Sequence, residues 1–363
     1  MSPASLPLLV RVLRSPHATV DFDLGQWDLL LRQAANANLL VSLLYLLEDN
    51  GVLDAVPAAP RVHLEWARLA AAGHARSVRH EVARIGAALA GLGVPLILLK
   101  GAAYSMAGLD AGRGRLFSDI DILVPKSRLD EVEGALMLHG WASTHHDPYD
   151  QRYYREWMHE IPPMVHVRRG NTIDVHHAIL PETAASRPDP ARLRASAIPI
   201  AGMENLYTLC PHDMFLHSAV HLFSGGEFDH GLRDLFDLYR LMHQFDTEPG
   251  FWEGLPARAA ELELTRPLFY AMRYTERLLD SRIPQAVFDA AAGGRPPAPL
   301  LALMDALFMR SLLPQHPSCN GRSHAAARFA LYIRGNWLRM PPLLLSQHLF
   351  YKAFLSPREN VTT

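Results

Sequence analysis

The chain has 363 residues, with 35 Lys and Arg against 37 Asp and Glu and a formal net charge of -2. This length allows a substantial core and about two domains, and the near-neutral charge disfavours a nucleic acid partner, which usually meets a basic surface. Cys210 and Cys319 are the only cysteines, so we expect neither a disulfide framework nor a thiol zinc site, and a cytoplasmic setting fits best.

The N-terminal segment, residues 1–93, has the pattern of a helical region. Apolar residues recur at helical spacing over 23–47 and again over 61–92, with glycines after both stretches. The most apolar run, 38–47, is about half the length that a membrane-spanning helix needs. The first residues also lack the basic start of a secretory signal. We therefore expect no contact with a membrane.

The middle segment, residues 94–190, changes to a mixed pattern. The run VPLILLKG at 94–101 predicts a buried strand that leads into a helix, and 127–139 predicts a helix capped by Ser127. Two strands are expected around Val165 and Val175, joined by a turn at Gly170 and Asn171. A loop is expected over 181–192.

The C-terminal segment, residues 191–363, is mostly helical in pattern, with one long helical stretch over 211–244. The three segments together predict an α+β fold, in which a mixed sheet with helices lies between N- and C-terminal helical regions.

The stretch RGRLFSDIDILVP, residues 113–125, carries two acids inside an apolar strand pattern. On a strand, Asp119 and Asp121 point to one face, and Ile120 and Ile122 to the other. Two carboxylates on one face repel each other unless they lie at a solvated surface or a cation lies between them. Because apolar residues surround this pair, we expect a divalent metal there. In the absence of metal, an Asn at either position should leave stability unchanged or slightly raised.

A third acid, Asp174, lies in the strand pattern NTIDVHHAI, where it shares a face with His176. If this strand lies beside the acidic one, three carboxylates converge, and such an oxygen set suits one or two Mg²⁺ ions. Upstream, LLKGAAYS places Lys100 and Gly101 where a strand runs into a helix, and glycine there lets the backbone approach a phosphate. The spacing is not that of a P-loop.

The runs LLKGAAYS, GRLFSDIDILV and IDVHHAI together resemble the uncharacterised bacterial nucleotidyltransferases of the DNA polymerase β superfamily. The resemblance covers residues 95–179, and more loosely the helical segment over 210–241. It implies a polymerase β-like core that moves a nucleoside monophosphate from an NTP to a hydroxyl of a small molecule or protein. ATP is the expected donor, with two Mg²⁺ ions. It assigns Asp119, Asp121 and Asp174 as catalytic metal ligands, and Gly101 to the triphosphate.

The sequence departs from that family where Ala102 follows Gly101, because the family has a serine there. The loop before the acidic pair is also longer than in compact members. We expect Lys100 and Arg115, lying outside the core, to replace the missing phosphate contact. Ser118 and His176 complete the set of expected nucleotide contacts. The acceptor is unidentified.

Two alternatives stay open at this point. The dipeptide His212-Asp213, with Asp234 or Asp237 downstream, resembles the HD metal-dependent phosphohydrolases, and His217 and His221 have the spacing of a metal pair on a helix. Asp237 is also a candidate for the acceptor pocket or for a general base. The other alternative is a non-catalytic scaffold that keeps the nucleotidyltransferase fold.

Overall fold

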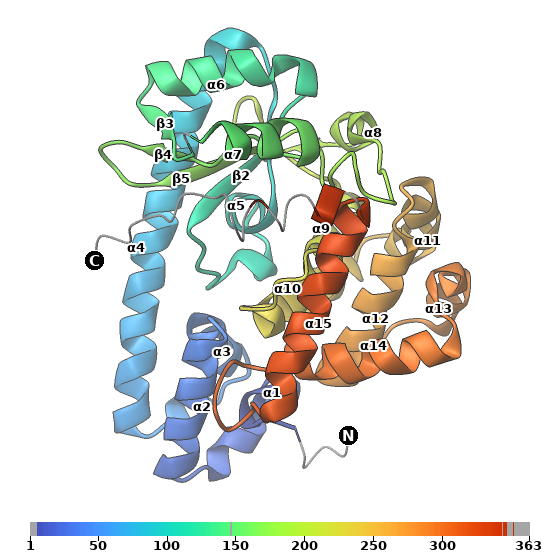
Figure 1. Ribbon diagram of the computed structural model, residues 1–363. Coiled ribbons are helices and arrows are strands. Elements are labelled where there is room, and N and C mark those ends of the chain that lie inside the picture. Colours follow the sequence, from blue (N-terminus) through green and yellow to red (C-terminus); the bar gives the residue numbers. More distant parts are fainter. Residues whose placement is uncertain (1–5, 146, 343, 347–350, 352–363) are drawn as a thin grey trace.

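The computed structural model describes residues 6–145, 147–342, 344–346 and 351. A seven-stranded mixed sheet occupies the upper part of the molecule in Figure 1, with helices around it. The long helix α4 (Ala58–Leu89) runs down one side, and the C-terminal helices cover the other. This architecture confirms the predicted α+β class.

The strands lie in the order β3-β4-β5-β2-β1-β7-β6, so β2 is central. It is parallel to β5 and antiparallel to β1, and β1 is in turn parallel to β7. The strands are β1 (Leu96–Leu98), β2 (Asp119–Leu123), β3 (Trp141–Ser143), β4 (Met164–His166), β5 (Thr172–His176), β6 (Ile198–Pro199) and β7 (Leu206–Thr208).

The antiparallel pair β4 and β5 confirms the two strands predicted around Val165 and Val175. Gly170 in the turn has a φ of +73°, a conformation that glycine adopts without steric cost. Strands β6 and β7 were not predicted. They have two and three residues, too few for a side-chain alternation to be recognised. The predicted domain boundaries stay a prediction.

The N-terminal helices besides α4 are α1 (Leu8–Arg14), α2 (Leu24–Asn36) and α3 (Leu40–Asp49). The prediction of one helix over 23–47 was therefore wrong. The helix is interrupted at Asn38, between α2 and α3. The φ of Asn38 is +54°, and its side-chain amide donates to the Leu116 carbonyl at 3.0 Å. Asparagine tolerates this left-handed conformation better than most residues. The spacing of apolar residues continues across Asn38, so the sequence pattern did not reveal the break between the two helices.

The helices of the middle segment are α5 (Lys100–Met106), α6 (Leu129–Leu138), α7 (Pro148–Arg152) and α8 (Pro190–Ala195). Helix α6 starts two residues later than predicted, after a 3₁₀ turn, and Ser127 does not cap it. Strand β1 is also shorter than its apolar run, because α5 begins at Lys100.

The C-terminal helices are α9 (Pro211–Ser224), α10 (Gly231–Phe245), α11 (Phe251–Glu261), α12 (Thr265–Leu279), α13 (Gln285–Ala290), α14 (Ala298–Ser311) and α15 (Arg322–Arg339). The single helix predicted over 211–244 divides after α9, and Gly226 in the break has a φ of +89°. One hydrophobic core joins the N-terminal helices, the sheet and the C-terminal helices. None of the described helices has the length and apolar character needed to cross a membrane.

Candidate active site

The register between β2 and β5 brings the three aspartates together. Asp121 lies directly opposite Asp174 in the parallel pair, and Asp119 lies two residues before Asp121 on the same strand face. One carboxylate oxygen from each residue lies within 4.8 Å of the other two. The strand with Asp174 thus lies beside the strand with Asp119 and Asp121, as the predicted convergence of the three acids required. The role of these residues as metal ligands stays a prediction.

Asp121 is buried within a chain of charged partners. Its Oδ1 accepts a hydrogen bond from Lys100 Nζ and another from His176 Nε2, each at 2.9 Å. On the other side of the ring, His176 Nδ1 lies 3.2 Å from Glu160 Oε2. Burial alone would raise the pKa of Asp121, but Lys100 and then His176 hold it well below its usual value. Asp121 is therefore a carboxylate at any ordinary pH.

The same network raises the pKa of its two cations. Burial favours the neutral forms, but Asp121 outweighs it at Lys100, and Glu160 with Asp121 outweighs it at His176. Both nitrogens of His176 face carboxylates, Nε2 at 2.9 Å from Asp121 Oδ1 and Nδ1 at 3.2 Å from Glu160 Oε2, and this favours the protonated ring in the metal-free protein.

Asp174 has the opposite environment. Its Oδ1 is buried and has no hydrogen-bond partner within the described part of the chain. Burial first, and then the Asp121 and Glu160 carboxylates, raise the pKa of Asp174 to about 8. An unpaired buried carboxyl is costly unless something else meets its oxygen. The three aspartates offer only oxygen ligands, one of them unsatisfied, so the donor set fits a hard divalent cation such as Mg²⁺.

Lys100 adopts a backbone conformation that is unusual for its residue type. Its φ is +46°, in the left-handed region, where a non-glycine residue costs about 1 kcal/mol or more. It is the first residue of α5, directly after the buried end of β1. The ion pair with Asp121 offsets this strain. Strain of this kind often accompanies functional positions.

Gly101 is explained by close packing. A Cβ at this position would overlap the Arg115 guanidinium and lie 2.6 Å from the Phe117 ring. The segment before β2 therefore folds directly over the start of α5. This packing accounts for the glycine by itself, and the predicted phosphate contact of Gly101 stays a prediction.

Arg115 is buried, so the expectation that it lies outside the core was wrong. Its Nε donates to Asp237 Oδ2 at 2.5 Å, and Asp234 lies 3.5 Å away. The guanidinium also lies over the Tyr104 ring. Helix α10 supplies both carboxylates, and the sequence could not show that α10 packs against this loop. Asp237 is thus engaged by Arg115, which argues against its use as a general base.

Ser118 lies beside the aspartates, with its Oγ 3.4 Å from Asp119 Oδ1. His159 and Glu160, in contrast, were missed by the sequence reasoning. They lie between α7 and β4, and Glu160 forms an isolated β-bridge with His176. No periodic pattern marks this segment, so the sequence offered no signal for its place beside β5.

The residues of the phosphohydrolase hypothesis lie elsewhere and have other partners. His212 Nε2 lies 2.9 Å from the Phe251 carbonyl, and its ring stacks on Phe251. Asp213 accepts two hydrogen bonds from Arg258. Neither residue belongs to a three-ligand metal cluster among the residues that the structure describes. The structure gives this hypothesis no support.

Two small cavities adjoin the aspartates. One of about 80 Å³ is lined, among other residues, by Asp119, the first residue of β2, and by Ser118 just before it. One of about 40 Å³ is lined by six basic or histidine residues, Lys100, His159, His176, His217, His221 and Arg339, together with Ser224, Gly225 and three apolar residues. His217 and His221 therefore face the candidate site rather than forming a separate metal pair.

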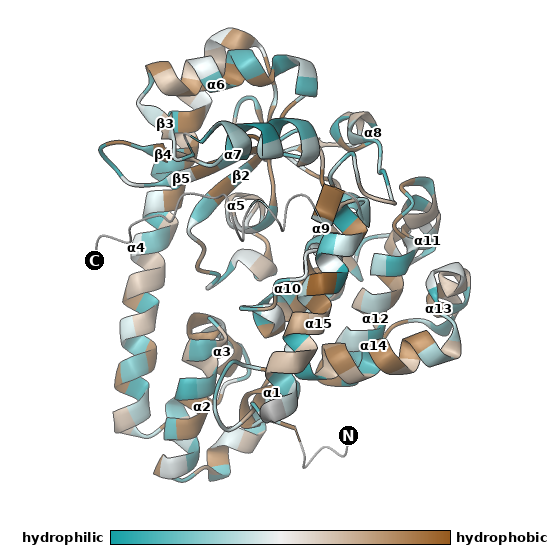
Figure 2. Cartoon of the chain, in the orientation of Figure 1, coloured by the Kyte–Doolittle hydropathy of each residue, from teal (hydrophilic) through white to brown (hydrophobic). Residues whose placement is uncertain are grey.

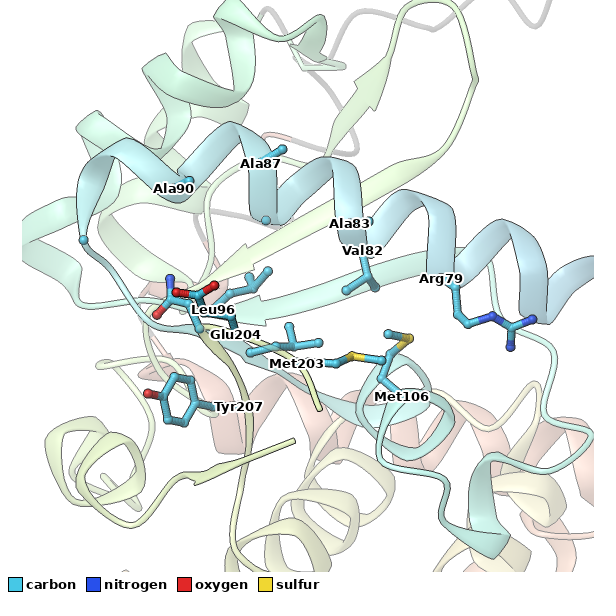
Figure 3. Close-up of a pocket in the computed structure, with 14 residues that line it drawn as sticks. Arg79, Val82, Ala83, Ala87, Ala90, Leu96, Met106, Met203, Glu204 and Tyr207 are labelled. Atoms are coloured by element: carbon cyan, nitrogen blue, oxygen red, sulfur yellow. The ribbon is translucent and has the colours of Figure 1, made fainter. Parts of the chain in front are cut away.

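Two larger cavities lie farther out. An apolar cavity of about 720 Å³ between α9, α12, α14 and α15 shares Leu180, Ser224 and Arg339 with the small histidine-lined cavity. Another, of about 890 Å³, lies between α4 and the start of β1, beside β7, where Figure 3 shows Arg79, Val82, Met106 and Met203 around it. Neither the three aspartates nor Lys100 and His176 line this second cavity, so it is separate from the candidate site.

Comparison with known protein families gave a match over most of the chain. A family model described as an uncharacterised nucleotidyltransferase matches residues 23–280, which is more than half of the chain and includes β2, β5 and all three aspartates. The chain belongs to this nucleotidyltransferase family. No curated protein and no solved structure matched significantly. Membership in this family supports a transferase, and the family description names no metal, nucleotide or acceptor.

The contrast between Asp121 and Asp174 predicts opposite effects of the same substitution. Asp121→Asn leaves Lys100 and His176 without their carboxylate and should lower the free energy of unfolding by about 3–5 kcal/mol. Asp174→Asn removes an unpaired acid and should raise it at pH 7 by at least about 1 kcal/mol. Chemical denaturation in EDTA measures both. For Asp121, the expected loss of stability replaces the expectation from the sequence that Asn would leave stability unchanged or slightly raised. A lower stability of Asp174→Asn would contradict the assignment of Asp174 as an unpaired acid.

The raised pKa of Asp174 also predicts a pH dependence. The unfolded chain loses this proton near the ordinary value of 3.8, but the folded chain keeps it up to about 8. The metal-free protein should therefore lose stability relative to Asp174→Asn as the pH rises through this range. Paired denaturation curves at pH 4, 6 and 8 test it. Equal differences at all three values would contradict the prediction.

Burial of Arg115 predicts a stability role. Arg115→Ala should lower the free energy of unfolding by about 3–5 kcal/mol, because it leaves Asp237 and Asp234 without a cation in the core. Arg113→Ala is the matched control, since Arg113 pairs with Asp49 at the surface and should cost less than about 1 kcal/mol. Similar melting of the two variants would show that the Arg115 pairs contribute little.

Proposed function

We propose that the chain is a Mg²⁺-dependent nucleotidyltransferase that moves a nucleoside monophosphate from an NTP, with ATP as the expected donor, to an acceptor hydroxyl. The oxygen of the acceptor attacks the α-phosphorus, and pyrophosphate leaves. The observation that carries the proposal is the convergence of Asp119, Asp121 and Asp174 at the parallel pair of β2 and β5, with Asp174 Oδ1 buried and unpartnered.

Asp119, Asp121 and Asp174 would hold the metal. When bound, the ion neutralises charge on the phosphates and on the group in transfer. Both hydrogen bonds to Asp121 end on Oδ1, and no described residue donates to its Oδ2. Lys100 and His176 therefore fix the carboxylate and leave one oxygen for the cation, so the chain's own residues pre-orient this ligand.

The cationic side of the site supports a triphosphate contact. Lys100 spends one donor on Asp121, and an ammonium group has three. Lys100 also lines the small cavity together with Arg339. We propose that Lys100 contacts phosphate oxygens there. Arg115 is not part of this role, because α10 already engages it.

The large apolar cavity supports an acceptor with an apolar portion. Its volume of about 720 Å³ lies in the usual range for small-molecule sites. Leu303 on α14 and Ile333 and Trp337 on α15 are among its lining residues and are exposed, and Figure 2 shows hydrophobic residues along both helices. Because this cavity adjoins the small one, we propose that the acceptor binds here and directs its hydroxyl toward the aspartates.

The non-catalytic scaffold is the remaining alternative, and nucleotide binding separates the two. We expect calorimetry with ATP to show binding that is strengthened by Mg²⁺ or Mn²⁺ and lost in EDTA. Asp119→Asn should reduce transfer of label from α-labelled ATP by several orders of magnitude while keeping a native melting temperature. Incubation of the protein with labelled ATP and cell metabolites, followed by mass spectrometry of the labelled products, should identify the acceptor.

Two controls make the result decisive. Leu303→Glu should bind ATP normally but lose product, because a charge in the apolar cavity opposes the acceptor. Glu182→Gln, at a surface ion pair with Lys126, should behave as the wild type. Absence of any NTP binding in the presence of Mg²⁺ would favour the scaffold, and ATP binding of equal strength without metal would contradict the proposed metal role.

A further inference from the structure

A second group of possible metal ligands adjoins the aspartates and differs from them in chemistry. His159, Glu160 and His176 each offer one ligand atom, and these atoms lie within 4.8 Å of one another. The backbone fixes the group, because Glu160 forms a β-bridge with His176, and the His177 N–H donates to the His159 carbonyl at 2.8 Å. The three side chains are thus held beside the end of β5.

The distances suit a small cation. Zinc ligands lie about 2.0–2.2 Å from the metal, so two ligands in a tetrahedral site are about 3.3–3.5 Å apart. Glu160 Oε2 and His176 Nδ1 are 3.2 Å apart. The pair could therefore share one metal ion with little movement, once the ion displaces the proton from His176 Nδ1, because only an unprotonated ring nitrogen binds a metal. Two imidazoles and one carboxylate select zinc or a similar transition metal over Mg²⁺, which prefers oxygen alone.

The surroundings provide two further features of metal-binding histidines. A ligand histidine usually donates its other ring N–H to a carboxylate, and His176 Nε2 donates to Asp121. In addition, His159 Nδ1 is buried and has no hydrogen-bond partner among the described residues. A buried ring nitrogen without a partner costs free energy, and a metal ion or a water would remove that cost.

The local charge is compatible with a divalent cation. Lys100 and Arg339 line the same small cavity and oppose a cation there. Glu160 and Asp121 adjoin His176 directly and balance them.

We propose that His159, Glu160 and His176 form a second metal site, which takes one divalent transition metal ion such as Zn²⁺. Strand β5 then contributes Asp174 to the oxygen site and His176, two residues later on the same face, to the nitrogen-containing site. An ion bound there would fix the His176 ring and, through its Nε2–H, the Asp121 carboxylate. The proposal does not depend on nucleotide transfer.

The full-length chain, stripped with EDTA and returned to buffer with millimolar Mg²⁺, should be titrated with Co²⁺ and followed by visible absorption, with Zn²⁺ as competitor. We expect one equivalent to bind and Zn²⁺ to displace it. His159→Gln and Glu160→Gln should each weaken binding at least 10-fold. Asp174→Asn should bind Co²⁺ as the wild type does, because it belongs to the oxygen site. His177→Gln is the matched control, since it is a neighbouring buried histidine outside the cluster.

X-ray absorption of the zinc-loaded wild-type protein tests the same proposal without any variant. Two imidazole nitrogens and carboxylate oxygen in the zinc shell are the expected result. A shell of oxygen alone, unchanged Co²⁺ affinity in both His159→Gln and Glu160→Gln, loss of Co²⁺ binding in Asp174→Asn, or no Co²⁺ binding at all in the presence of Mg²⁺ would each overturn the proposal.

Discussion

The parallel pairing of β2 with β5 places Asp121 directly opposite Asp174, and the rest of the site follows from this register. Two acids so close together, one buried and the other half-buried, cannot both be ionised without compensation. Lys100 and His176 both donate to Asp121 and none of the described residues donates to Asp174 Oδ1, so one acid is fixed as a carboxylate and the other holds its proton. The protein thus holds one ionised carboxylate with a fixed orientation and one acid whose Oδ1 lacks a partner, a combination that the proposed divalent cation would stabilise.

The ion pair between Lys100 and Asp121 requires an unusual backbone conformation at Lys100. Lys100 reaches Asp121 from a left-handed backbone conformation at the junction of β1 and α5. The next residue must be a glycine, because Arg115 and Phe117 occupy the space of its side chain. Arg115 in turn is held by two carboxylates of α10. A C-terminal helix therefore supports the loop before β2, which means that the site is not built by the central segment alone.

The C-terminal helices also shape what surrounds the aspartates. Helix α9 brings His217 and His221 to the small cavity, and α15 brings Arg339. Beyond Arg339, α14 and α15 border an apolar cavity that is large enough for a small molecule. A charged region, where we propose that metal binds, and an apolar region thus adjoin each other. This arrangement suits the proposed reaction between a polar nucleotide and a less polar acceptor.

The sequence alone determined the α+β class, the acidic strand and the third acid, because the alternation of side chains on a strand is a local property that a single segment reveals. It also carried the family, since the motifs of 95–179 are local. It did not determine the partners of those residues. Arg115 was expected at the surface, and only the packing of α10 put it in the core. His159 and Glu160 lie in a segment without a regular pattern, and only their bridge to β5 brought them to the site. Contacts between segments distant in the chain depend on how helices and strands pack, and that is the information that only the tertiary structure supplied.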